Sequence, residues 1–80
     1  MTYQLSPNKE LCSARELIAV TNANECRLAA MSLGYDFGEE EHSSEWPTGC
    51  YKAGYVVWNS HPNGDPERKK GVQEVCRSNG

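Results

Sequence analysis

Hydrophobic residues recur with helical spacing in only one part of this chain. Cys26, Ala29, Ala30 and Leu33 are three or four positions apart, so they would share one face of a helix over residues 23–33. The two alanine side chains are small and allow a close approach to the layer beneath. The pattern therefore predicts a helix whose cysteine- and alanine-lined face belongs to the core.

The residues that flank this segment are typical of helix ends. Asn22 can act as the N-cap, and Glu25, three residues later, can return a capping-box hydrogen bond. Gly34 stands where a left-handed C-terminal cap is expected. These signals predict where the helix begins and ends.

The other hydrophobic runs are short and typical of strands, and the run at 55–58 is β-branched and aromatic throughout. Ala53 and Gly54 predict a hairpin turn between two of them. The apolar run at 17–20 fits a strand or a helix equally well. The predicted strands cover residues 3–5, 50–52, 55–58 and 72–76. The chain, residues 1–80, is thus expected to be one α+β domain with one helix packed on a small antiparallel β-sheet.

Two polar segments predict loops. Residues 36–45 contain three consecutive glutamates, and we expect an acidic, solvated loop there. Residues 60–66 combine serine, proline, asparagine, glycine and aspartate, which are typical turn residues. An ion site at either segment would need ordered ligands that these patterns do not indicate, so no metal site and no cofactor are predicted.

The composition leaves too little apolar material for an ordinary core. Leucine, isoleucine, valine and phenylalanine make up 12 of 80 residues, below the share of about 20% at which a chain resembles a disordered one. The net charge is only -3, so the strong self-repulsion typical of disordered chains is absent. Cysteines are therefore expected to supply the missing stability.

The four cysteines are spaced too widely for a usual zinc site, which favours two disulfides. Three pairings are possible, and spacing alone does not choose among them. Cys12 and Cys76 lie near the two ends of the chain, which favours a Cys12–Cys76 bridge around an inner Cys26–Cys50 bridge. Disulfides predict an extracellular or cell-surface location.

Charge and hydropathy exclude several classes of function. The chain has 11 acidic and 8 basic residues, which argues against nucleic-acid binding. It contains no apolar run of the roughly 18–20 residues that cross a membrane, so membrane insertion is not expected. The first ten residues lack the pattern of a signal peptide, so a secreted protein would be represented here by its mature part or by an excised module.

A two-residue turn at Ala53 and Gly54 would set the register of the hairpin, because paired residues share a face and successive residues alternate. In that register Cys50 faces the helix, while Tyr51 and Trp58 lie together on the opposite face. Two interpretations stay open. Either the N-terminal segment or the 36–45 loop covers this face as a second small core, or the aromatic pair is an exposed platform.

An exposed platform would suit a binding site. Aromatic faces beside amide and carboxylate groups can stack on sugar rings or form a protein interface. The candidate ligand-binding residues are Tyr51, Trp58, Asn59, His61, Asn63 and Asp65. No catalytic residues are predicted, because a cysteine nucleophile would need a free thiol and no carboxylate sits at a position expected to be buried.

Two motifs together carry a family resemblance. E-C-x2-A-A-x2-L-G around Cys26 and P-x-G-C-Y around Cys50, with Trp58 and the final Cys76, resemble a short cysteine-rich module similar to PAN/apple domains. Such modules occur in secreted and surface proteins of algae and other protists. The resemblance spans residues 3–76 and implies the nested pairing, an extracellular setting and non-enzymatic binding of proteins or carbohydrates.

The expected function is therefore an extracellular recognition or adhesion module that binds a glycan or a protein and is not an enzyme. The alternative is a structural one, in which copies of the chain assemble into a surface layer, stalk or filament.

Overall fold

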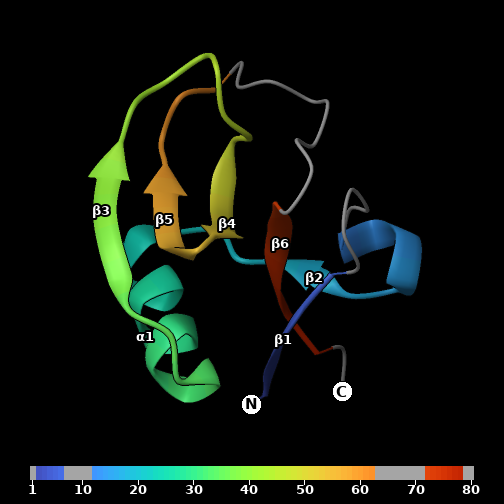
Figure 1. The fold of residues 1–80 in the computed structure, drawn as a ribbon. Helices are drawn as coiled ribbons and strands as arrows, with labels where there is room; N and C mark the ends of the chain where they lie inside the picture. Colours follow the sequence, from blue (N-terminus) through green and yellow to red (C-terminus); the bar gives the residue numbers. More distant parts are fainter. Residues whose placement is uncertain (1, 7–11, 63–71, 79–80) are drawn as a thin grey trace.

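The computed structural model describes residues 2–6, 12–62 and 72–78 and places one helix against a six-stranded, mostly antiparallel sheet (Figure 1). The strand order is β1-β6-β4-β5-β3, and β2 also pairs with β6. Among the described strands, only β3 and β5 pair in parallel. The elements are β1 (Tyr3–Leu5), the 3-10 helix η1 (Cys12–Arg15), β2 (Ile18–Ala19), α1 (Ala23–Leu33), β3 (Phe37–Glu41), β4 (Gly49–Ala53), β5 (Tyr55–Asn59) and β6 (Gln73–Arg77). The predicted α+β class is confirmed.

The helix α1 begins and ends where its flanking residues predict. The backbone N–H of Glu25 donates to the side chain of the N-cap Asn22 over 2.7 Å. Gly34 adopts φ 80° at the C-terminal end, a conformation that glycine reaches without strain. The Glu25 carboxylate accepts from Tyr3 and pairs with Arg77 at 3.3 Å, which ties the first turn of the helix to β1 and β6.

The main core lies between α1 and the sheet, where the helix contacts β1, β3, β5 and β6. The predicted helix face of cysteine and alanine is buried in it, and larger, partly buried side chains surround this centre. The buried residues are Val20, Cys26, Ala29, Ala30, Cys50, Val56 and Val75, and Tyr3, Leu5, Leu33, Phe37 and Trp58 pack against them.

The two disulfides join Cys12 to Cys76 and Cys26 to Cys50, as favoured from the sequence. Cys26 and Cys50 lie in the core beside α1. Val75 belongs to the same core, so the next residue of β6, Cys76, points to the opposite face of the sheet. One bridge therefore fastens the helix to β4, and the other fastens η1 to β6 from the other side.

The hairpin of β4 and β5 has a register that differs from the predicted one. Ala53 pairs with Tyr55, so Gly54 alone forms the turn, at φ 81°. Cys50 then pairs with Trp58, and both face the helix. The prediction that Trp58 shares a face with Tyr51 is wrong, because a shift of one residue exchanges the two faces of a strand.

The predicted loop at 36–45 is also wrong in part, because residues 37–41 form β3. This strand pairs with β5 along one edge of the sheet. Its charged residues are largely exposed. Charged side chains commonly protect edge strands against unwanted pairing. The same charges made this segment resemble a loop in the sequence. Residues 63–66 of the other predicted loop lie outside the described residues.

The remaining expectations concern short elements and membrane insertion. The apolar run at 17–20 contains the two-residue strand β2. The strands predicted at 3–5, 50–52, 55–58 and 72–76 correspond to β1, β4, β5 and β6 within one residue at each end. Among the described residues, no helix is long and apolar enough to cross a membrane.

Candidate functional site

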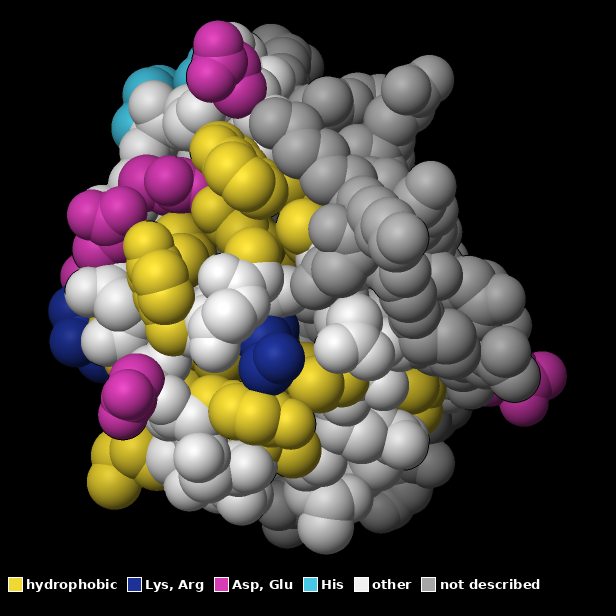
Figure 2. Space-filling model, viewed as in Figure 1, with side chains coloured by type: hydrophobic (Ala, Val, Ile, Leu, Met, Phe, Trp, Pro, Cys, Tyr) yellow, Lys and Arg dark blue, Asp and Glu magenta, His cyan; other side chains and the backbone are white. Residues whose placement is uncertain are grey.

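The face of the sheet opposite α1 carries a second, smaller hydrophobic cluster. Tyr51, Val57 and Val72 are its buried members, and Trp46 and Ala53 pack against them. Figure 2 shows hydrophobic side chains gathered over β3, β5 and β4, with acidic side chains along their left side. The second small core considered from the sequence therefore exists, but Trp46 and Val72 contribute to it.

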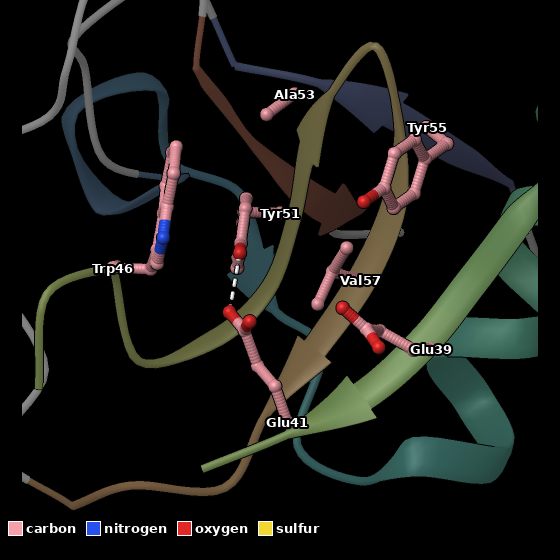
Figure 3. A pocket seen from close by; sticks show the side chains of 7 residues that line it. All are labelled: Glu39, Glu41, Trp46, Tyr51, Ala53, Tyr55 and Val57. Carbon is pink, nitrogen blue, oxygen red and sulfur yellow. Dashed lines mark hydrogen bonds between the residues drawn. The ribbon is translucent and has the colours of Figure 1, made fainter. Parts of the chain in front are cut away.

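Beside this cluster the face is hollowed (Figure 3). One hollow of about 150 Å³ is walled by Trp46, Tyr51, Ala53, Tyr55 and Val57 and carries Glu39 and Glu41 at its margin. A wider depression of about 360 Å³ shares Glu39 and Tyr55 with it and adds Asp36 and Gly38. Because they share two lining residues, the hollows are adjacent, and we call them together the acidic–aromatic groove.

Tyr51 forms the inner wall of the groove. It is buried, and its ring lies parallel to that of Trp46, with 5.8 Å between ring centroids and 4° between the planes. Its hydroxyl donates a hydrogen bond to the Glu41 carboxylate. Burial raises the pKa of Tyr51 far above its ordinary value, and the hydrogen bond and the charge of Glu41 raise it further. The hydroxyl thus stays a donor and fixes the Glu41 carboxylate at the groove.

Tyr55 stands between the two hollows and is 46% exposed. Its ring lies directly against the backbone of Gly38, since a Cβ atom at that position would come within 2.0 Å of Tyr55 Cδ2. The pairing of β3 with β5 is irregular between Phe37 and Glu39, around this glycine. The absence of a side chain at position 38 therefore leaves the space that the Tyr55 ring occupies.

The acidic residues of β3 point to different sides of the sheet. Glu39 and Glu41 line the groove, whereas Glu40 pairs with Arg27 of α1 over 2.8 Å on the helix side. Alternation along a strand explains this division. No ion pair between described residues involves Glu39 or Glu41. The groove therefore carries negative charge that the described part of the chain does not neutralise by direct contact.

Asn59, a predicted ligand-binding residue, is buried beneath the segment that follows β3. Its amide donates to the carbonyls of Ser43, Trp46 and Pro47 over 2.8–3.0 Å. Its carbonyl oxygen accepts from the backbone N–H groups of Ser43 and His61. Asn59 therefore holds the backbone that presents Trp46, and its own amide faces the protein interior.

The other predicted site residues are not assembled into one platform. Tyr51 lies in the groove, but Trp58 packs against the helix-side core. The His61 ring lies 4.7 Å from that of His42, beside the segment that Asn59 holds. Asn63 and Asp65 lie outside the described residues.

Sequence reasoning missed most of the groove. The one signal that could have found Glu39 and Glu41 is their spacing of two, which puts them on one face once residues 37–41 are seen as a strand. Trp46 precedes β4 and Tyr55 belongs to β5, and only the fold brings both rings to one hollow. Gly38 has no sequence signal of its own, because its role depends on a ring from another strand.

One cluster has the residue types of a metal site. Potential ligand atoms of Cys12, Glu74 and Cys76 lie within 4.8 Å of one another. Both sulfur atoms are bonded in a disulfide, however, so they cannot act as thiolate ligands. The Glu74 carboxylate accepts a hydrogen bond from the backbone N–H of Cys12 over 2.6 Å, which indicates a structural role.

Comparisons with known proteins add no functional assignment. The chain matches no family model, no curated protein and no solved structure. The similarity to PAN/apple domains stays a prediction, and the acidic–aromatic groove is interpreted from its own geometry.

Proposed function

We propose that this chain is a non-catalytic, extracellular recognition module that binds a carbohydrate or a protein through the acidic–aromatic groove. The observation that carries the proposal is the half-exposed ring of Tyr55, which stands with Trp46 beside two carboxylates in a hollow. Aromatic rings beside polar groups provide contact area and orienting hydrogen bonds, which is how recognition surfaces commonly work.

The covalent chemistry of the chain supports an extracellular, non-catalytic role. All four cysteines are in disulfides, which persist in oxidising compartments. The same bonds leave no thiol for nucleophilic catalysis. The groove hydroxyl with a perturbed pKa, that of Tyr51, is held more firmly in its protonated form, which disfavours a nucleophilic phenolate.

Two exposed tyrosines allow a matched test. Tyr55 lies in the groove, whereas Tyr35, 38% exposed, lies outside it beneath the Lys52 ammonium. The wild-type protein is applied to a glycan array and to a display library of peptides, and every bound ligand is titrated against Tyr55→Ala and Tyr35→Ala. We expect Tyr55→Ala to weaken binding by about tenfold or more, as for an aromatic anchor, and Tyr35→Ala to have little effect.

The binding comparison is meaningful only if both tyrosine variants are folded. Far-UV circular dichroism of both variants should match that of the wild type, because both rings are substantially exposed. Ligands that bind Tyr55→Ala and Trp46→Ala as tightly as the wild type would place recognition elsewhere and refute the proposal.

Self-assembly is the second candidate function, favoured by the outer face of α1. Leu28 and Met31 are 58% and 76% exposed, and their spacing of three puts them side by side. Such an apolar pair suits contact with another copy of the chain. Light scattering coupled to size-exclusion chromatography would detect oligomers, which Met31→Glu should dissociate, whereas a monomer at all concentrations contradicts this alternative.

A further inference from the structure

The acidic–aromatic groove has a charge pattern that indicates the chemistry of its ligand. Asp36, Glu39 and Glu41 line the groove together with the exposed ring of Tyr55, and no described basic side chain forms an ion pair with them. Lys52, on the neighbouring hairpin strand, instead places its ammonium 4.8 Å from the ring centroid of Tyr35.

We propose that the groove binds an arginine side chain of a protein partner, with its guanidinium against the Tyr55 ring and between the carboxylates of Glu39 and Glu41. This inference rests on the proposed recognition function and deepens it, because it selects a protein over a glycan and names the group that is recognised.

The position of two carboxylates at one hollow favours a cation over a neutral sugar. Glu39 and Glu41 are two residues apart on one face of β3, so their backbones are separated by about 6.6 Å. Figure 3 shows both carboxylates turned toward the hollow. A cation between two such groups gains from both charges and relieves their mutual repulsion.

The Glu41 carboxylate is already oriented for this contact. It accepts a hydrogen bond from the hydroxyl of Tyr51, which is a buried donor. A carboxylate offers about four lone-pair positions, so one hydrogen bond leaves capacity for a bidentate partner. The preorganised position reduces the entropy that binding would otherwise cost.

The aromatic walls favour arginine over lysine. A guanidinium is planar, is weakly hydrated, stacks on aromatic rings and pairs with a carboxylate through two parallel hydrogen bonds. The Tyr55 ring is exposed, and Trp46 lies across the same hollow. A lysine ammonium would gain the charge attraction without the stacking contact, so we expect it to bind more weakly.

Nuclear magnetic resonance detects such weak binding directly. The ¹⁵N-labelled protein is titrated with acetyl-Gly-Arg-Gly-amide and with matched peptides that carry lysine or glutamine at the centre. We expect the arginine peptide to shift the indole N–H of Trp46 and the amides of Glu39 and Tyr55, the lysine peptide to shift them less, and the glutamine peptide to leave them unchanged. Raising the salt concentration from about 20 to 500 mM should weaken the arginine response severalfold.

Adjacent residues of β3 provide the matched variants. Glu39→Gln and Glu40→Gln remove the same charge from the same strand, but only Glu39 faces the groove. We expect Glu39→Gln to weaken the arginine peptide about two- to fivefold, as for an exposed charge pair, and Glu40→Gln to leave its affinity within experimental error.

Equal responses to the arginine and glutamine peptides, or equal weakening by both variants, would overturn the arginine inference. Failure of this inference is distinct from failure of the proposed function. The arginine peptide can fail to bind while a glycan or another peptide binds in a Tyr55-dependent manner. In that case the proposed recognition function is supported and the proposed specificity for arginine is refuted.

Discussion

Two buried polar side chains shape the groove through hydrogen bonds within the protein. Asn59 holds the carbonyls of Ser43, Trp46 and Pro47, and Tyr51 holds the Glu41 carboxylate. Both residues were predicted to bind a ligand because their types suit recognition. The structure gives them partners within the protein, since a polar group removed from water must be satisfied internally.

Removing the Asn59 amide should destabilise the whole chain. Asn59→Ala leaves three carbonyls and two N–H groups without this partner, at an expected cost of about 2–4 kcal/mol in the free energy of unfolding. Urea unfolding measures this cost. Asn24→Ala, at an exposed helix position, serves as the control and should change stability by less than about 0.5 kcal/mol. Equal effects of the two variants would show that the amide network is not stabilising.

Tyr51 should make stability depend on alkaline pH. Its pKa in the folded chain is raised from 10.0, chiefly by burial, so the folded state holds the proton more firmly than the unfolded state. The stability gained from this difference is present below about pH 10 and is lost as the pH rises further. Between pH 9 and 11 we expect the free energy of unfolding to fall by about 1 kcal/mol more in the wild type than in Tyr51→Phe.

Urea unfolding at several pH values tests the contribution of Tyr51. Tyr55→Phe is the control, since it also removes one hydroxyl but at a half-exposed position. A parallel decline in wild type and Tyr51→Phe would contradict the assigned role.

At the scale of elements, β3 decides where the groove lies. It contributes two carboxylates to one face and the Glu40–Arg27 ion pair to the other. The Tyr55 ring of β5 packs against the β3 backbone at Gly38, where there is no side chain. An edge strand and its neighbour thus form one side of the groove together.

The contact between Gly38 and Tyr55 can be measured by a double-mutant cycle. Gly38→Ala places a methyl group where the ring lies, so we expect the ring to be displaced at a cost of about 1 kcal/mol. In a Tyr55→Ala background the same substitution should lower the free energy of unfolding much less, because there is no ring for the methyl group to displace. Denaturant unfolding of the four proteins gives the coupling free energy, and equal costs in both backgrounds would exclude this contact.

At the scale of the whole molecule, the two disulfides fasten opposite faces of one sheet. Cys26–Cys50 closes a sequence separation of 24 residues and Cys12–Cys76 one of 64. Together they compensate for the small number of large aliphatic side chains. The sheet can therefore keep one face partly open for a groove.

Reduction should unfold the chain. In the loop-entropy model the bridges contribute about 3.5 and about 4 kcal/mol, comparable to the net stability of a small domain. We expect 10 mM dithiothreitol to abolish the near-UV circular dichroism signal. The double variants Cys12→Ala/Cys76→Ala and Cys26→Ala/Cys50→Ala should each lower the unfolding free energy by amounts of this order. A native signal that persists after verified reduction would contradict this account.

Local signals in the sequence were sufficient for the helix, and the positions of Cys12 and Cys76 near the two ends favoured the nested disulfides without excluding the other pairings. The Asn22 cap and the Gly34 terminus depend on a few adjacent residues, and the apolar spacing between them defines the buried face. Strand positions were also recognisable from short β-branched and aromatic runs, because these residues suit a pleated and partly buried surface.

The sequence by itself therefore determined the helix with its ends, the α+β class and the dependence on cysteine bridges, all of which follow from short-range patterns or positions in the chain. Tertiary structure decided the register of the hairpin, where a single residue at Gly54 exchanged the faces of Tyr51 and Trp58 relative to each other. Tertiary structure also made residues 37–41 a strand, because their backbone groups pair with those of β5. The hairpin register depends on the exact length of its turn, and β3 depends on pairing with a strand about 18 residues away in the chain. The acidic–aromatic groove forms only when both are in place.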